Sequence, residues 1–134
     1  MSGRETDPRA WVEKAEHDLL AVRSIVAGPS VPWDIVVFHA QQGAEKYLKG
    51  FLVLHEKVVP KIHDLERLVK LCAAIAPSLM PLQSDCRRLT QLGFVSRYPD
   101  TPDEPTEADA HEAMRLAVYI CDAVRPLLGL SGGQ

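Results

Sequence analysis

The chain has 134 residues and a mass of 14.8 kDa. Of these residues, 46% are hydrophobic and 25% are charged. This size fits one compact domain with its own core and excludes a two-domain enzyme. The formal net charge of -3 excludes a protein that coats nucleic acid by bulk charge, although a local basic site remains possible. No apolar run approaches the roughly 20 residues of a membrane span, and the first residues lack a signal-peptide pattern. We therefore expect a cytoplasmic protein without membrane contact.

Prolines and glycines cluster along the sequence and divide it into five stretches with helical periodicity. The first stretch carries apolar residues at steps of three and four from Trp11 to Val26 and ends at Gly28. The second opens with Pro32 in its first turn and runs to about Glu56, which predicts the longest helix of the molecule. Its apolar positions nearly surround it, so we expect it at the centre of the fold: Ile35, Phe38, Ala44, Leu48, Phe51 and Leu52.

The other three stretches also begin with recognisable signals. Asp64 is a good cap residue for the third, which ends before Pro77, and the fourth runs from about Leu82 to Val95. The fifth begins at Thr106, which with Asp109 three residues later makes a weaker relative of the capping box. It continues as a close-packing seam rich in alanine: Ala110, Ala113, Ala117, Ile120, Val124 and Leu127.

These patterns predict an all-α fold, an up-and-down antiparallel bundle of four to five helices, because no stretch alternates long enough to indicate a strand. We expect a single domain over residues 1–134, with its core at about 8–128 and disordered tails. The three cysteines are odd in number and lie among apolar neighbours, so we expect them in the core rather than in disulfides or a metal knuckle: Cys72, Cys86 and Cys121.

The second helix carries a polar edge that suggests chemistry. His39, Gln42, Lys46 and Lys49 follow one another at steps of three, four and three, so they share one side of the helix. Two cations and two hydrogen-bonding groups in a row suit a phosphate or a base. The alternative is a solvated face, stabilised by about 0.2 to 0.5 kcal/mol through the pair that Glu45 makes with Lys49. The apolar residues on the other sides fit either a neighbouring helix or a second chain: Val36, Val37 and Tyr47.

The segment 96–105 is the part of the chain that packing explains least. Its prolines fall at every third position, which suits a stiff, exposed connection between two helices. Arg97 offers a planar fork for phosphate or carboxylate, and Tyr98 offers a ring that stacks on a base. The alternative is that Arg97 pairs with Asp100 or a helix end, while Tyr98 attaches the loop to the bundle.

Other polar groups give weaker signals. His63 and Asp64 suit an acid/base pair, although Asp64 already has a role as a cap residue. The sequence contains no glycine-rich phosphate loop and no GxSxG, so we predict no cofactor and disfavour a self-sufficient hydrolase. An acidic run before the fifth helix has no calcium-loop spacing, so we predict no metal site: Asp100, Asp103, Glu104, Glu107 and Asp109.

Four segments in this order carry a family resemblance: AEHDLL at 15–20, FHAQQGAEKYLKG at 38–50, HDL at 63–65 and RYPD at 97–100. Over about residues 10–128 the chain resembles the HEPN family. The resemblance implies a helical bundle that usually forms a homodimer. Small stand-alone members look like partners of minimal nucleotidyltransferases, encoded beside them as toxin and antitoxin, and such proteins have been regarded as binding nucleotides or RNA.

Many members of that family are metal-independent ribonucleases, whose site combines an arginine and a histidine with four to six residues between them. This chain departs from that pattern, because the first histidine after Arg97 is His111, with thirteen residues between the two. Arg97 is carried over as the family-like arginine, and His39 or His63 is the candidate for the missing imidazole.

We therefore expect a HEPN module that binds a nucleotide, RNA or a nucleotidyltransferase partner. The alternatives are a metal-independent ribonuclease with a displaced histidine and a plain dimerisation scaffold. The residues expected to contact the ligand are His39, Gln42, Lys46, Lys49, Arg97, Tyr98 and Asp100.

Overall fold

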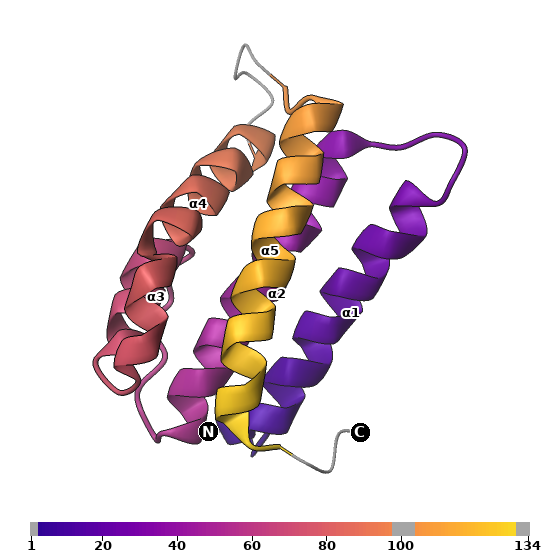
Figure 1. Cartoon of the computed structure of the whole chain (residues 1–134). Helices are drawn as coiled ribbons and strands as arrows, with labels where there is room; N and C mark the ends of the chain where they lie inside the picture. Colours follow the sequence, from indigo (N-terminus) through magenta and orange to yellow (C-terminus); the bar gives the residue numbers. More distant parts are fainter. Residues whose placement is uncertain (1–2, 98–103, 131–134) are drawn as a thin grey trace.

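The described part of the chain folds into a bundle of five α-helices with two short 3-10 helices (Figure 1). This computed structural model describes residues 3–97 and 104–130, with side chains up to residue 94 in the first range. No strand occurs within these ranges, so the predicted all-α class is confirmed. The elements are η1 (Gly3–Thr6), α1 (Pro8–Val26), α2 (Trp33–Leu54), α3 (Leu65–Ala73), η2 (Pro77–Leu82), α4 (Gln83–Arg97) and α5 (Glu107–Leu128).

Helix α2 lies at the centre of the bundle, as its apolar surface predicted. It contacts α1, α3, α4 and α5. Figure 1 shows α1 beside it on one side and α3 with α4 on the other. It is not the longest helix, however, because α2 and α5 both have 22 residues. Helix α5 continues through Pro126 and ends only at Gly129, whose left-handed backbone (φ 63) is the usual helix stop.

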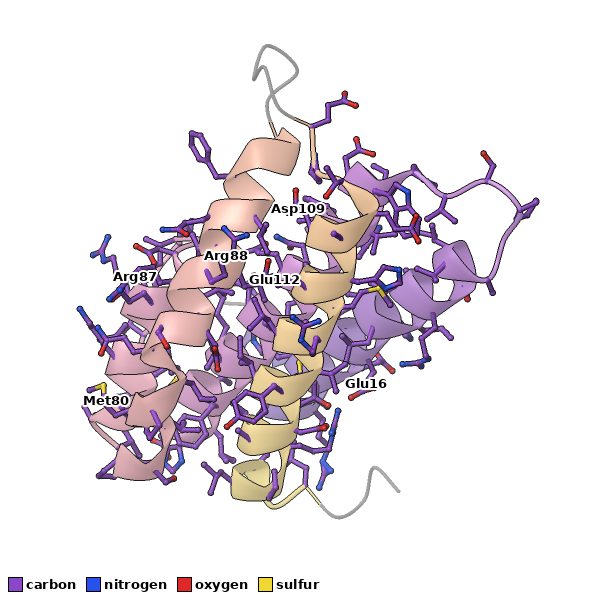
Figure 2. The ribbon with its side chains drawn as sticks, turned by 45° about the horizontal axis from the view of Figure 1, so that its top comes forward. Glu16, Met80, Arg87, Arg88, Asp109 and Glu112 are labelled. Carbon is purple, nitrogen blue, oxygen red and sulfur yellow. The ribbon has the colours of Figure 1, made fainter. Side chains whose placement is uncertain are left out.

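Local signals explain where most helices begin. The Asp64 carboxylate accepts hydrogen bonds from the first backbone N–H groups of α3, and Thr106 forms a complete capping box with Asp109 at the start of α5. Pro32 precedes α2 as its cap residue instead of lying inside the first turn. An ion pair also joins two neighbouring helices: Arg88 on α4 donates two hydrogen bonds of 2.9 Å to the carboxylate of Glu112 on α5 (Figure 2).

The structure corrects the expected core at three positions. Ile35 and Phe38 are 40% and 38% exposed, because they lie on the opposite side of α2 from the buried Val36, Val37 and Ala40. Leu127 is 39% exposed, and Leu128, four residues after the buried Val124, takes the core position instead. Three residues that could have faced either a neighbouring helix or a second chain are fully buried within this chain: Val36, Val37 and Tyr47.

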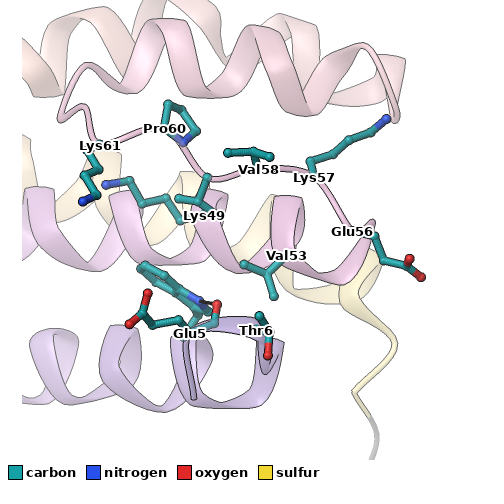
Figure 3. A pocket seen from close by; sticks show the side chains of 11 residues that line it. Glu5, Thr6, Lys49, Val53, Glu56, Lys57, Val58, Pro60 and Lys61 are labelled. Atoms are coloured by element: carbon teal, nitrogen blue, oxygen red, sulfur yellow. Dashed lines mark hydrogen bonds between the residues drawn. The ribbon is translucent and has the colours of Figure 1, made fainter. Parts of the chain in front are cut away.

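The segment between α2 and α3 brings distant residues together. Glu56 adopts a left-handed backbone conformation (φ 58), and the backbone N–H of Lys57 donates to the carbonyl of Leu52 at 2.9 Å. The chain therefore reverses and runs back along α2, as Figure 3 shows for residues 56–61. This return segment, residues 56–63, ends beside the middle of α2. It places His63 against Glu45 and Gln41, which lie 18 and 22 positions earlier in the sequence. None of the described helices has the length and apolar character of a membrane span.

Candidate functional site

A buried ionic cluster lies where the return segment meets α2, and we call it the Glu45 cluster: Gln41, Glu45, Lys49 and His63. One Glu45 oxygen, Oε1, accepts a hydrogen bond from Gln41 Nε2 at 3.1 Å and lies 3.0 Å from His63 Nδ1. The other, Oε2, accepts from Lys49 Nζ at 2.9 Å. Glu45 is 4% exposed and Lys49 6%, so this pair is not the solvated surface pair that the spacing also allowed.

His63 is held by this cluster in one orientation. Its Nδ1 lies against the Glu45 carboxylate, which favours the proton on that nitrogen and leaves Nε2 as the acceptor in the neutral ring. Gln41 adds a second restraint, because its amide donates to the His63 carbonyl at 3.0 Å. The His63 side chain is 58% exposed, so Nε2 is accessible to a ligand. A carboxylate that orients an imidazole in this way is an arrangement suited to proton transfer.

A small cavity of about 160 Å³ lies beside this imidazole, lined by Gln41, His63, Asp64, Thr90 and Phe94. Two contacts fix its α4 wall. Thr90 Oγ1 accepts from the backbone N–H of Leu65 at 2.9 Å. A Cβ at Gly93 would lie 3.1 Å from the Gln41 side chain, so this glycine lets α4 approach α2 closely.

Position 97 belongs to the same side of α4 as this cavity. It follows Thr90 by seven residues and Phe94 by three, which is the spacing of one helical face. Arg97 is the last residue of α4. Its side chain lies outside the described residues, as do Tyr98 and Asp100, so their predicted contacts remain predictions.

A second carboxylate holds the other half of the predicted polar edge. Asp18 of α1, 7% exposed, binds His39 Nδ1 at 2.8 Å through one oxygen and Lys46 Nζ at 2.6 Å through the other. Gln42 instead donates to the Gln41 side chain at 3.0 Å. The four predicted residues therefore share a helix edge but belong to two different ion-pair groups.

Sequence reasoning missed several parts of the site. Asp18 was visible only as part of a charged run, and Glu45 as the partner of Lys49 in a surface pair. Thr90 and Phe94 were not predicted, although their spacing from Arg97 was a signal that could have found them. Among the described residues, no group of three His, Cys, Asp or Glu side chains is arranged to hold a metal ion.

A third polar group, around Tyr47, has a structural role. The Tyr47 hydroxyl donates to Glu16 on α1 and accepts from Arg125 Nε on α5 at 3.1 Å. Burial and the hydrogen bond to Glu16 raise the pKa of Tyr47 well above its usual range, so the phenol keeps its proton. This contact joins α1, α2 and α5 through one hydroxyl.

Comparison with known proteins gives a family match for this chain. The model of the HEPN domain family matches residues 8–127. No curated protein and no solved structure matches the chain. Since the family match spans nearly the whole sequence, the chain belongs to the HEPN domain family.

Proposed function

We propose that this HEPN module binds a nucleotide or a segment of RNA on the face formed by α2, α4 and the end of the return segment. The observation that carries the proposal is the imidazole of His63, which Glu45 holds through Nδ1 at the edge of a cavity, with Nε2 open to a ligand. An oriented imidazole beside amide and hydroxyl groups suits recognition of a base edge or a ribose.

Each side of this face has a proposed contribution. Phe94 is 58% exposed and offers a ring on which a base stacks. Gln42, half-buried, offers its amide group, while Arg97 at the end of α4 is the proposed phosphate contact. Lys46 contributes less than the sequence suggested, because a carboxylate 2.6 Å away already offsets its charge.

Titration of fluorescently labelled AMP and of a short labelled RNA, followed by anisotropy, tests this proposal. Arg97→Ala should weaken binding about tenfold, since a charge-assisted hydrogen bond is lost. The matched control is Arg23→Ala, an exposed arginine on α1, across α2 from α4 (Figure 1). Equal affinities of the two variants would remove the end of α4 from the site.

The ribonuclease alternative is favoured by the same imidazole. His63 Nε2 would accept the proton of a ribose 2′-hydroxyl while the 2′-oxygen attacks the neighbouring phosphorus. The bond from phosphorus to the 5′-oxygen of the next nucleotide breaks, that oxygen takes a proton from water, and a 2′,3′-cyclic phosphate remains. Incubation with mixed RNA, with and without EDTA, distinguishes the two functions. Cleavage that survives EDTA and is lost in both Arg97→Ala and His63→Ala would make this chain an enzyme, whereas binding without cleavage supports the module alone.

We also propose a homodimer whose interface includes the open side of α2. Ile35 and Phe38 lie three positions apart on one side of α2 and are 40% and 38% exposed, so together they form an apolar surface there. Sedimentation should show a dimer that Phe38→Glu converts to monomers. Leu20→Glu is the control, because Leu20 lies about 200° around α1 from Asp18, which faces α2.

The proposed protein partner is a minimal nucleotidyltransferase encoded beside this chain, in a toxin–antitoxin-like pair. Co-expression of the two with a tag on one tests this, and co-purification at a fixed ratio is the expected result. Melting with and without ligand gives a further distinction. A plain dimerisation scaffold predicts no ligand-dependent shift in melting temperature, whereas a ligand-binding module predicts that ligand raises the melting temperature of the wild-type dimer.

A further inference from the structure

A larger cavity is lined in part by Lys49 and shares no residue with the cavity beside His63. Its volume is about 590 Å³, within the range of small-molecule sites. Figure 3 shows it between the start of the chain, the second half of α2 and the return segment. Its surface is mostly apolar, and the charged side chains around it are three lysines and two glutamates: Lys49, Lys57, Lys61, Glu5 and Glu56.

One wall of this cavity is a fixed aromatic ring. Trp11 approaches α2 at Gly50, where a Cβ would lie only 3.0 Å from the Trp11 Cβ, so glycine allows this close approach. The indole Nε1 donates to the Glu5 carbonyl at 3.0 Å, which holds the ring in place. Val53 and the return segment supply the facing apolar surface. A flat apolar molecule therefore fits between the two walls.

The end of the cavity toward the middle of α2 carries positive charge. Lys49 is 6% exposed, and Glu45 supplies the single carboxylate partner of its ammonium among the described residues. An ammonium has three N–H donors, so two remain for a ligand. Figure 3 shows the Lys49 and Lys61 side chains extending toward the same end of the cavity. Lys61 makes no ion pair with any described residue.

We propose that this cavity binds a small planar apolar molecule that carries one carboxylate or phosphate group. Its apolar body lies against Trp11 and Val53, and its anionic group meets Lys49 and Lys61. Lys61, which makes no ion pair with a described residue, supplies the net positive charge, whereas Lys49 supplies N–H donors beside its ion pair with Glu45. The site is separate from the proposed nucleotide or RNA face, because the two cavities share no lining residue.

Calorimetric titration of the full chain with three probes of one shape tests the charge requirement. The probes are 1-naphthoate, 1-naphthyl phosphate and neutral 1-naphthalenemethanol. At least one anionic probe should bind saturably and at least fivefold more tightly than the alcohol. The anion that binds more tightly identifies carboxylate or phosphate as the natural group. Equal affinity for the neutral probe, or no binding by either anion, would overturn the proposal.

Two lysine variants locate the binding. Lys61→Gln should weaken binding of the anionic probe about tenfold and leave the alcohol unchanged, because a single charge-assisted contact is lost. Lys70→Gln is the matched control, since Lys70 is an exposed lysine on α3 that does not line the cavity. If Lys61→Gln and Lys70→Gln bind the anion equally, the cavity is not its site. Both variants change exposed side chains, so folding is preserved for the comparison.

Discussion

Replacement of Lys49 by methionine measures how strongly the Glu45 cluster depends on its buried cation. Methionine keeps most of the lysine stem but cannot donate to the Glu45 carboxylate. Loss of one partner from a buried ion pair costs about 3 to 5 kcal/mol, because it leaves a buried charge uncompensated. Gln41 and His63 still contact Glu45 in this variant, so we expect a loss of about 3 kcal/mol, at the lower end. Urea unfolding followed by circular dichroism at 222 nm gives this value.

Two further variants make the test specific. Glu45→Gln in the Lys49→Met background should recover most of the loss, because a neutral amide needs no cation. Lys70→Met is the matched control. Lys70 and Glu66 have the same i, i+4 spacing at 3.9 Å, but the Lys70 side chain is 52% exposed, and no resolvable change is expected. A loss below about 1 kcal/mol for Lys49→Met, the value of a surface pair, would refute the reasoning.

Three other outcomes follow from the contacts. Thr106→Ala removes the capping box of α5 and should lower the free energy of unfolding by about 1 kcal/mol, measured by urea titration. The hydrogen bond from Arg87 lowers the pKa of Glu66 from its ordinary value of 4.5 to about 2. The stabilisation that this pair gives is therefore present above pH 4.5 and is lost as the pH falls toward 2. Glu66→Gln should flatten the fall in melting temperature over that range. Burial raises the pKa of two thiols to about 12, and all three cysteines are buried, so a thiol reagent at pH 8 should label them only after unfolding: Cys72, Cys86 and Cys121.

Local sequence determined most of the fold. The steps of three and four in apolar residues indicated all five α-helices, and the cap residues Asp64 and Thr106 marked two of the starts correctly. These signals are local, because a cap satisfies N–H groups within the next three residues and an apolar stripe follows from helix geometry alone. The 3-10 helix Pro77–Leu82 was missed, since its two prolines read as a break.

Only the tertiary structure decided how the polar residues combine. The spacing on α2 placed Lys46 and Lys49 on one edge. It could not show that Lys46 pairs with Asp18 of α1, or that Lys49 is buried in its pair with Glu45. It also could not bring His63 to Glu45, because that contact depends on the reversal at Glu56 and the path of the return segment. Helical period and capping are encoded within a few residues, whereas burial and charge pairing depend on which segments meet across the fold.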